Sequence, residues 1–193
     1  LSKIENLERI RYTTSHPKDL TDDLIEIHGE CKKLMPLLHL PVQSGSTKIL
    51  KNMNRGHTIE EYLEIIEKIK EENPSIKFSS DFIIAYPSEN QDDFEKTLSL
   101  MKKVEFINSY SFIFSPRPGT PAANLKTIDT TIAKERLSIF QKLADEVKKE
   151  YRKGLINVTA NVLFENKVRD TNNYFGRDKY FNSVIVNSNE NLA

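Results

Sequence analysis

The stretch LHLPVQSGSTKILKNMNRGHT, from Leu38 to Thr58, combines three local patterns that together indicate the fold. An apolar run at 37–42 predicts a buried strand, and the polar residues 43–46, with a glycine among them, predict a turn. The apolar spacing from Ile49 to Met53 then predicts a short helix. In α/β proteins, the turn after a parallel strand lies at the carboxyl edge of the sheet, where ligands bind. We therefore expect residues 43–46 to belong to a binding site.

The same order of strand, turn and helix recurs through residues 1–150. This repetition predicts a parallel sheet with crossover helices, and therefore an α/β fold. Four such units do not close an eight-stranded barrel. The sheet is therefore either small and open or the later part of a larger barrel. Strands are expected at 9–14, 37–42, 76–85 and 106–114, and helices at 20–34, 58–72, 91–104 and 129–152.

Helix boundaries can also be predicted from short signals in the sequence. The pair Thr58 and Glu61, and likewise the pair Ser88 and Gln91, have capping-box spacing. Gly154 is expected to end the long helix. A helix tail is expected at residues 4–7, and Cys31 is expected on the core-facing side of the next helix.

A change of period near Tyr151 predicts a second domain at 151–193. Residues 155–164 and 180–187 alternate in the manner of strands, and a polar connection is expected at 170–179. The chain begins with Leu1 rather than methionine and ends at Ala193 directly after a strand-like run, so we expect a fragment of a longer chain.

Composition excludes several classes of protein. The 28 basic and 28 acidic residues cancel, so net charge does not identify a nucleic-acid partner. No apolar run is long enough to span a membrane, and no signal peptide opens the chain. The single cysteine, Cys31, excludes an internal disulfide and favours a reducing, cytoplasmic location. It also excludes an iron–sulfur or structural zinc site built from several cysteines of this chain.

The turns after the four strands should meet at one edge of the sheet. The side chains of these turns are mostly neutral hydrogen-bond donors and acceptors. The turns contain no pair of carboxylates for acid–base catalysis, no nucleophile elbow and no phosphate-binding loop. Such a set suits a ribose, an amino acid or a base. Each candidate also has a structural alternative: strand capping for His16, loop closure for Gln43 and Ser44, the helix dipole for Glu89, and a surface ion pair for Arg117.

Four segments, at 9–25, 39–62, 80–98 and 112–123, resemble the radical S-adenosylmethionine methylthiotransferases in order and spacing. The forms TTSHP and LPVQSGS…MNRG are similar to the branch that acts on isopentenylated adenosine in tRNA. A branch acting on threonylcarbamoyladenosine and a non-catalytic RNA-binding module are the alternatives.

The resemblance implies strands three to six of a partial (β/α)6 radical-SAM barrel, followed by a truncated TRAM domain, a small all-β, OB-like domain that binds RNA. It further implies a radical reaction of S-adenosylmethionine at C2 of the adenosine. The cofactors would be S-adenosylmethionine and two 4Fe-4S clusters whose ligands are absent from this chain. The implied partners are tRNA and a sulfur donor for the auxiliary cluster, with a monomeric protein.

The resemblance also assigns site residues, with no catalytic residue or metal ligand in this fragment. Ala85 and Ser88 stand where the family usually has glycines, and we expect them to crowd the cofactor. The implied cofactor-binding residues are Gln43, Ser44, Glu89 and His16, and the implied RNA-binding residues are Arg55, Arg117, Lys167 and Arg177.

Overall fold

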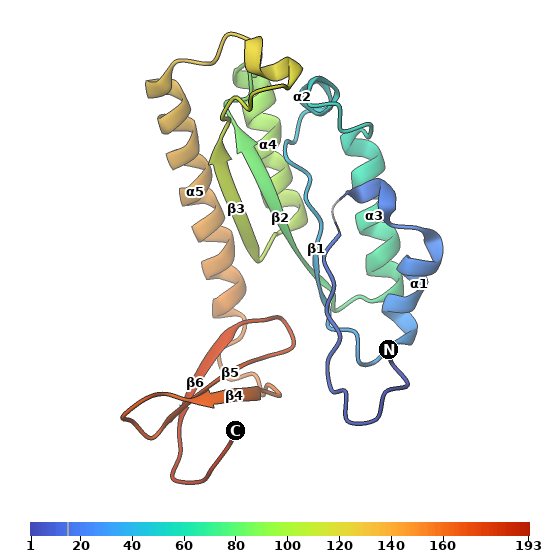
Figure 1. Ribbon diagram of the computed structural model, residues 1–193, viewed down its shortest axis with the longest axis vertical. Helices are drawn as coiled ribbons and strands as arrows, with labels where there is room; N and C mark the ends of the chain where they lie inside the picture. Colours follow the sequence, from blue (N-terminus) through green and yellow to red (C-terminus); the bar gives the residue numbers. More distant parts are fainter. Residues whose placement is uncertain (15) are drawn as a thin grey trace.

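The computed structural model describes residues 1–14 and 16–193, so Ser15, in the turn expected after the first strand, lies outside the described residues. A parallel sheet in the order β1-β2-β3 forms the centre of the first part, as predicted (Figure 1). Its strands are β1 (Leu37–His39), β2 (Lys77–Ile84) and β3 (Asn108–Ile113). The register aligns Leu38 with Phe78 and Phe82 with Ser111.

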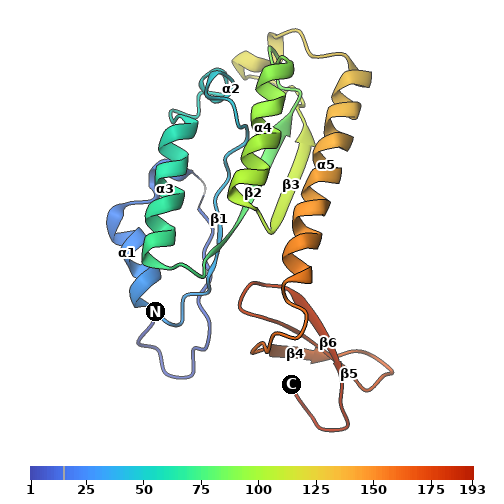
Figure 2. The same ribbon diagram turned by 180° about the vertical axis from the view of Figure 1, so that it is seen from behind.

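Helices connect these strands and cover one face of the sheet. They are η1 (Pro17–Asp19), α1 (Asp22–Glu30), α2 (Thr47–Asn52), α3 (Ile59–Glu72), α4 (Gln91–Val104), η2 (Pro121–Asn124) and α5 (Thr130–Lys153). Helix α4 lies behind β2 and β3 in Figure 1 and in front of them in Figure 2, while α5 runs beside β3.

The main core lies between this sheet and its helices. Phe82 is fully buried, and its ring lies 4.6 Å from Phe140 of α5 and 5.5 Å from Phe106, measured between ring centroids. On the opposite face of the sheet, Tyr110 and Phe112 are each 58% exposed. The two faces of the sheet therefore differ: one is packed against helices and the other is open.

The segment at 9–14 forms isolated bridges rather than the expected strand. Ile10 bridges Leu34 and Thr13 bridges His39, both in parallel. It lies at the edge of the sheet and has a neighbour on one side only, so few ladder hydrogen bonds hold it. Residues 4–7 form a bend and a turn with no helix, so the helix tail expected there was wrong. Cys31 caps the end of α1 and is partly exposed, rather than facing the core.

The helix caps agree with prediction in two of three cases. Thr58 and Glu61 form the expected capping box of α3, and α5 ends at Gly154 as expected. The predicted box of Ser88 and Gln91 was wrong, because α4 begins only at Gln91 and the residue before it, Asn90, takes the cap. Asn90 and Asp93 form the capping box instead.

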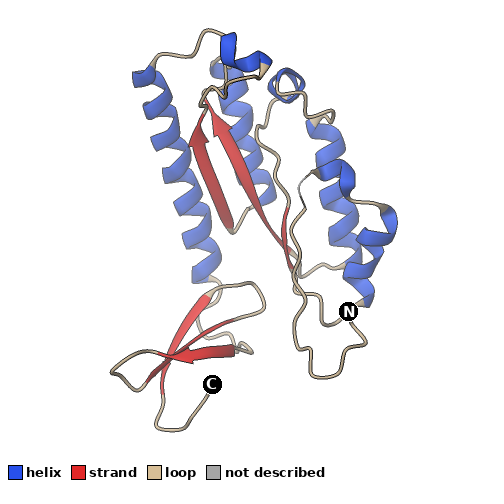
Figure 3. Ribbon diagram, in the orientation of Figure 1, coloured by secondary structure: helices blue, strands red, loops and turns tan. Residues whose placement is uncertain are grey.

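Three antiparallel strands follow α5 in the order β4-β5-β6 (Figure 3). They are β4 (Leu163–Lys167), β5 (Asn173–Arg177) and β6 (Ser183–Asn187). The expected polar connection at 170–179 was wrong, because it contains β5. Tyr174 and Gly176 alternate with more exposed residues there, and Gly176 packs so closely on β4 that a Cβ would lie 2.5 Å from the carbonyl oxygen of Leu163. In the described part of the chain, no helix is long and apolar enough to cross a membrane.

Candidate functional site at the carboxyl edge of the sheet

The segment after β1 continues alongside β2 before it turns. Gln43 N–H donates to the carbonyl of Asp81, and Ile83 N–H donates to the carbonyl of Gln43, both at 2.9 Å. Gln43 has a φ of 75°, in the left-handed region that L-residues rarely adopt, and its side chain remains partly exposed. The backbone pairing therefore holds Gln43, with its side-chain amide, at the carboxyl edge of the sheet.

Gly45 allows this turn to pack directly on α4. Its N–H donates to Thr97 Oγ1 at 2.9 Å, and a Cβ at this position would lie 2.4 Å from the carbonyl oxygen of Lys96. Ser44 is fully buried, with its Oγ 3.4 Å from Thr97 Oγ1, and it accepts a hydrogen bond from Ser46 N–H. The turn is therefore fixed against the neighbouring strand–helix unit.

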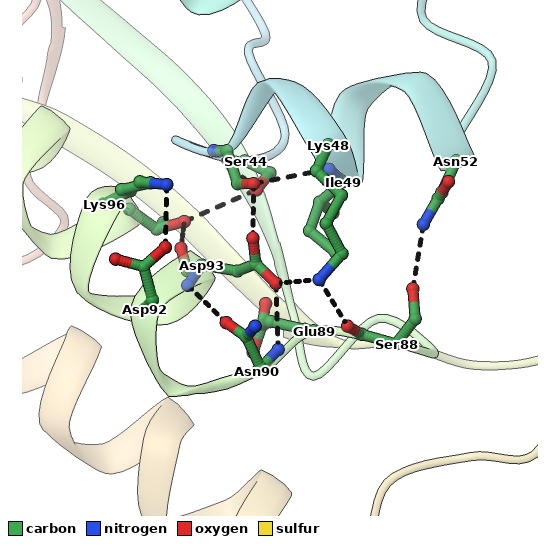
Figure 4. A network of polar contacts seen from close by, with 12 residues as sticks. Ser44, Lys48, Ile49, Asn52, Ser88, Glu89, Asn90, Asp92, Asp93 and Lys96 are labelled. Carbon is green, nitrogen blue, oxygen red and sulfur yellow. Dashed lines mark hydrogen bonds and ion pairs between the residues drawn. The ribbon is translucent and has the colours of Figure 1, made fainter.

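A buried carboxylate joins this turn to the turn after β2 (Figure 4). Asp93 accepts hydrogen bonds from Ser46 Oγ at 2.7 Å and from Lys48 Nζ at 2.5 Å, and Lys48 Nζ also donates to the carbonyl of Ser88 at 3.1 Å. Burial acts to raise the pKa of Asp93, but the hydrogen bonds from Lys48, the backbone of Asn90 and Ser46 outweigh it and lower that pKa. Asp93 is therefore held ionised, as a charged link between the two turns.

The turn after β2 has two residues in the left-handed region, Ala85 with a φ of 59° and Ser88 with a φ of 74°. Both are positions where the resembled family usually has glycine, the residue that adopts this region without strain. Ala85 N–H donates to Glu89 Oε1 at 3.1 Å, so the turn closes on its own carboxylate.

Arg136 of α5 completes the environment of Glu89. Its Nη1 lies 2.8 Å from Glu89 Oε1 and donates to the carbonyl of Glu89 at 3.0 Å. The two side chains are only 11% and 1% exposed. Burial raises the pKa of Glu89, and the hydrogen bond and positive charge of Arg136 oppose that rise. Glu89 Oε2 and Arg136 Nε are buried without a hydrogen-bond partner among the described residues.

His16 and Arg55 lie in one chain of contacts next to this edge. His16 Nδ1 accepts from Lys18 N–H and so caps η1, and its ring meets that of His57 edge-on, with 5.1 Å between centroids. His57 Nδ1 lies 3.2 Å from the carbonyl of Arg55, and Arg55 Nη2 donates to the carbonyl of Pro41 at 3.0 Å. The structure thus brings His16 and Arg55 towards the turn that holds Gln43.

The remaining candidates lie apart from these contacts, Arg117 at the same edge of the sheet and Lys167 and Arg177 on the second sheet. Arg117 is exposed in the loop after β3, where its carbonyl accepts hydrogen bonds from Thr120. Lys167 and Arg177 are on the antiparallel sheet, at the opposite end of β1–β3 from the two turns (Figure 1). Arg177 forms an ion pair with Glu165. The predicted residues therefore form one cluster at the carboxyl edge and a separate basic group on the second sheet.

Sequence reasoning missed Arg136, Thr97 and the role of Asp93. The spacing of Asn90 and Asp93 was a usable signal, since it is that of a capping box. Nothing in the local sequence connects Arg136 with Glu89, because the pair forms only when α5 packs against α4. Among the described residues, no group of three or more His, Cys, Asp or Glu side chains could hold a metal ion.

Comparisons with known proteins agree with this architecture. The family model described as "Radical SAM superfamily" matches residues 1–101. The chain therefore belongs to the radical SAM superfamily. The fold resembles coproporphyrinogen III oxidase (HemN) from Escherichia coli, a radical SAM enzyme, with a TM-score of 0.60, 13% identity, and coverage of 89% of this chain and 46% of that one. It also resembles Elp3 of Methanocaldococcus infernus, with a TM-score of 0.53, 14% identity, and coverage of 88% and 53%. These likenesses show an α/β partial barrel of the radical SAM type.

Proteins found by sequence comparison are far more similar to this chain in sequence than these two structures are. A protein of Pelagibacter ubique named tRNA-2-methylthio-N(6)-dimethylallyladenosine synthase is 58% identical over 100% of this chain and 44% of its own length. The protein of the same name from Zymomonas mobilis is 49% identical over 96% of this chain and 42% of its own length. The chain thus spans less than half the length of these relatives.

Proposed function

We propose that the protein methylthiolates C2 of isopentenylated adenosine in tRNA as a radical SAM transferase. The observation that carries this proposal is the 58% identity across the whole chain with a relative bearing that enzyme name. The turns at the carboxyl edge support it, because that edge is where α/β barrels hold their ligands.

In this proposal, S-adenosylmethionine binds at the carboxyl edge, where it would supply the radical and the methyl group. Gln43 fits a direct role, because its amide is partly exposed and its backbone is fixed beside β2. Ser44 and Glu89 fit a different role, since their side chains are buried and hydrogen-bonded to Ser46 and Arg136. They would shape the pocket, while His16 would border it.

The two 4Fe-4S clusters do not fit this chain. Cluster iron is normally held by several thiolates, and Cys31 is the only cysteine. We therefore derive no step through a cluster from these residues, and we place the cluster ligands, together with delivery of sulfur from its donor, outside residues 1–193.

We propose that residues 151–193 form part of a TRAM-type domain that binds the tRNA. The antiparallel order β4-β5-β6 and the basic side chains Lys167 and Arg177 support this assignment. Arg55 and Arg117 would meet RNA or the cofactor carboxylate on the barrel side. We expect the full-length protein to act as a cytoplasmic monomer.

Complementation tests the proposed reaction. A bacterial strain that lacks its own tRNA methylthiotransferases is supplied with the full-length gene, and its tRNA nucleosides are measured by mass spectrometry. We expect the 2-methylthio derivative of isopentenyladenosine to return, with an empty vector as control. If the threonylcarbamoyl nucleoside gains the methylthio group instead, the substrate assignment is wrong. If neither nucleoside changes while the protein binds tRNA, the non-catalytic RNA-binding alternative is favoured.

A further inference from the structure

A cavity of about 460 Å³ lies on the open face of the parallel sheet, against the antiparallel sheet. Its volume is in the range of small-molecule sites, which often lie at domain interfaces. Residues of the parallel sheet, of the segment at 9–14 and of the turn between β5 and β6 form it, including Arg11, His39, Ser79, Asn108, Tyr110 and Phe181. None of them belongs to the turns at the carboxyl edge, so this is a separate site.

The wall from the parallel sheet carries a fixed polar group. His39 Nδ1 lies 3.0 Å from Ser79 Oγ, and His39 Nε2 lies 3.5 Å from Asp81 Oδ2. Asn108 adds an amide with both a donor and an acceptor. Both ring nitrogens of His39 are engaged in these contacts, so Ser79 Oγ and the Asn108 amide are the groups that can recognise the edge of a planar, hydrogen-bonding ring.

Two aromatic side chains at the cavity keep much of their surface exposed. Tyr110 is 58% exposed and Phe181 is 49% exposed. Tyr110 also meets the ring of His39 edge-on, with 6.2 Å between centroids. Large exposed aromatic side chains next to a polar wall are typical of surfaces on which nucleobases stack.

The backbone holds Phe181 in an unfavourable conformation. Its φ is 64°, in the left-handed region that non-glycine residues rarely adopt. The buried carboxylate of Asp178 maintains this turn, because Oδ1 accepts from the N–H groups of Tyr180 and Asn182 at 2.8 Å each. The turn therefore fixes where the Phe181 ring lies, although the ring is only half buried.

Two guanidinium groups lie over the ring of Phe181, that of Arg11 at 4.7 Å and that of Arg177 at 4.5 Å from the centroid. Arg11 Nη2 also donates to the carbonyls of Asp178 and Lys179, at 3.2 and 2.9 Å. Arg177 is paired with Glu165, so Arg11 supplies the positive charge beside the ring that could meet a phosphate of the RNA. Arginine beside aromatic rings is a common arrangement for binding single-stranded nucleic acid.

We infer that this cavity binds an unpaired base of the RNA substrate, packed against the aromatic side chains of Tyr110 and Phe181 with its edge against Ser79 and Asn108. The inference rests on the proposed function, because it presupposes an RNA substrate. From Ser79 to Ala85, along β2, the chain spans about 20 Å at ~3.3 Å per residue. The bound base is therefore not the one that reacts at the carboxyl edge. It is a second base that selects the RNA.

Fluorescence of 2-aminopurine tests this inference without any cluster or activity. Full-length protein is mixed with anticodon stem-loop RNAs in which 2-aminopurine replaces one unpaired loop base at a time. The anisotropy of a terminal fluorescein on the same RNA reports total binding. We expect quenching of 2-aminopurine at one loop position, since stacking on an aromatic ring quenches that fluorophore.

The substitution Phe181→Asn separates binding from folding. Asparagine tolerates a left-handed φ, so we expect this variant to melt at the same or a higher temperature and yet to lose the quenching. Because stacking contributes substantially to single-stranded binding, the affinity should fall roughly 5- to 150-fold. Phe181→Tyr should retain the quenching, and Tyr110→Ala should reduce it. The matched control is Phe112→Ala. Phe112 lies on the same strand as Tyr110 and has the same 58% exposure, but it is outside the cavity, so this variant should behave like the wild type.

Two results would overturn the inference, and they can be told apart. If the protein binds the RNA but Phe181→Asn and Phe112→Ala give equal quenching and affinity, the cavity does not bind a base and the proposed function stands. If the wild-type protein does not bind the stem-loop at all, the proposed function fails, and the inference fails with it.

Discussion

The ion pair between Glu89 and Arg136 allows a quantitative test of how the turn after β2 is held. We expect Arg136→Met to destabilise the protein by about 3–5 kcal/mol at pH 7.5, because it leaves a buried carboxylate without its positive partner. The structural basis is the exposure of the pair, 1% for the Glu89 side chain and 11% for Arg136. Methionine keeps apolar contact with Phe94, whose ring centroid lies 5.4 Å from the Arg136 guanidinium carbon, so lost packing contributes little.

The pH dependence of this loss of stability shows whether it comes from the unpaired charge of Glu89 or from lost packing. Burial already raises the pKa of Glu89 above its ordinary 4.5, and removing Arg136 would raise it further. A carboxyl group with a raised folded-state pKa stabilises the fold below the unfolded pKa, and this contribution is lost as pH rises through the folded pKa. The cost of Arg136→Met should therefore be largest at neutral pH and shrink as pH falls towards about 4.5.

Urea unfolding of full-length protein at several pH values measures this cost. Lys134→Met, an exposed change on the same helix, is the control and should stay within about 0.5 kcal/mol of wild type. The double variant Glu89→Gln/Arg136→Met should be more stable than Arg136→Met alone, since no unpaired charge remains buried. A loss for Arg136→Met that equals the control, or that does not change with pH, would refute this account of the turn.

Three further changes, one of them with a comparison substitution, test other parts of the fold, each by urea or thermal unfolding. Gly45→Ala should cost about 1–3 kcal/mol or more, because its Cβ would lie 2.4 Å from a backbone oxygen of α4; an unchanged midpoint would contradict the close packing. Ala85→Gly should stabilise by about 0.5–1 kcal/mol because Ala85 has a φ of 59°, whereas Ala133→Gly, within α5, should destabilise by about 1 kcal/mol or more. Burial lowers the pKa of His28, so its contribution to stability should be lost as pH falls below about 6.5, with a slope of at most about 1.4 kcal/mol per pH unit. His28→Gln should reduce that slope, and an identical slope would exclude His28 as its source.

The parallel sheet and its helices were predictable because their signals are local. The apolar run that contains β1 and the capping box at Thr58 each depend on residues close together in sequence. Strand β5 was missed because its buried face consists of Tyr174 and Gly176, and glycine gives no apolar signal. The first strand was overestimated, because a β-like composition at 9–14 does not reveal that the segment lies at an edge.

The sequence predicted where the candidate site lies, but it did not predict which side chains contact its turns. That Gln43 and Glu89 would occupy turns at one edge follows from the topology of parallel strands. The partners of these turns could not be predicted, because Arg136 and Thr97 reach them only through helix packing. The cavity near Phe181 depends on how two sheets meet, and no pattern along the sequence describes that meeting.

Helix α5 connects the carboxyl edge of the parallel sheet with the antiparallel sheet. Arg136 near its start is bound to the turn that holds Glu89, and Tyr151 near its end accepts a hydrogen bond from Asn182 in the turn that carries Phe181. These two positions are about 22 Å apart along the helix axis, at 1.5 Å per residue. A tilt of about 10° pivoted at Arg136 would therefore move Tyr151 by roughly 4 Å. Any such tilt would displace the second sheet more than the carboxyl edge, so the length of α5 links the geometry of the two ends of the molecule.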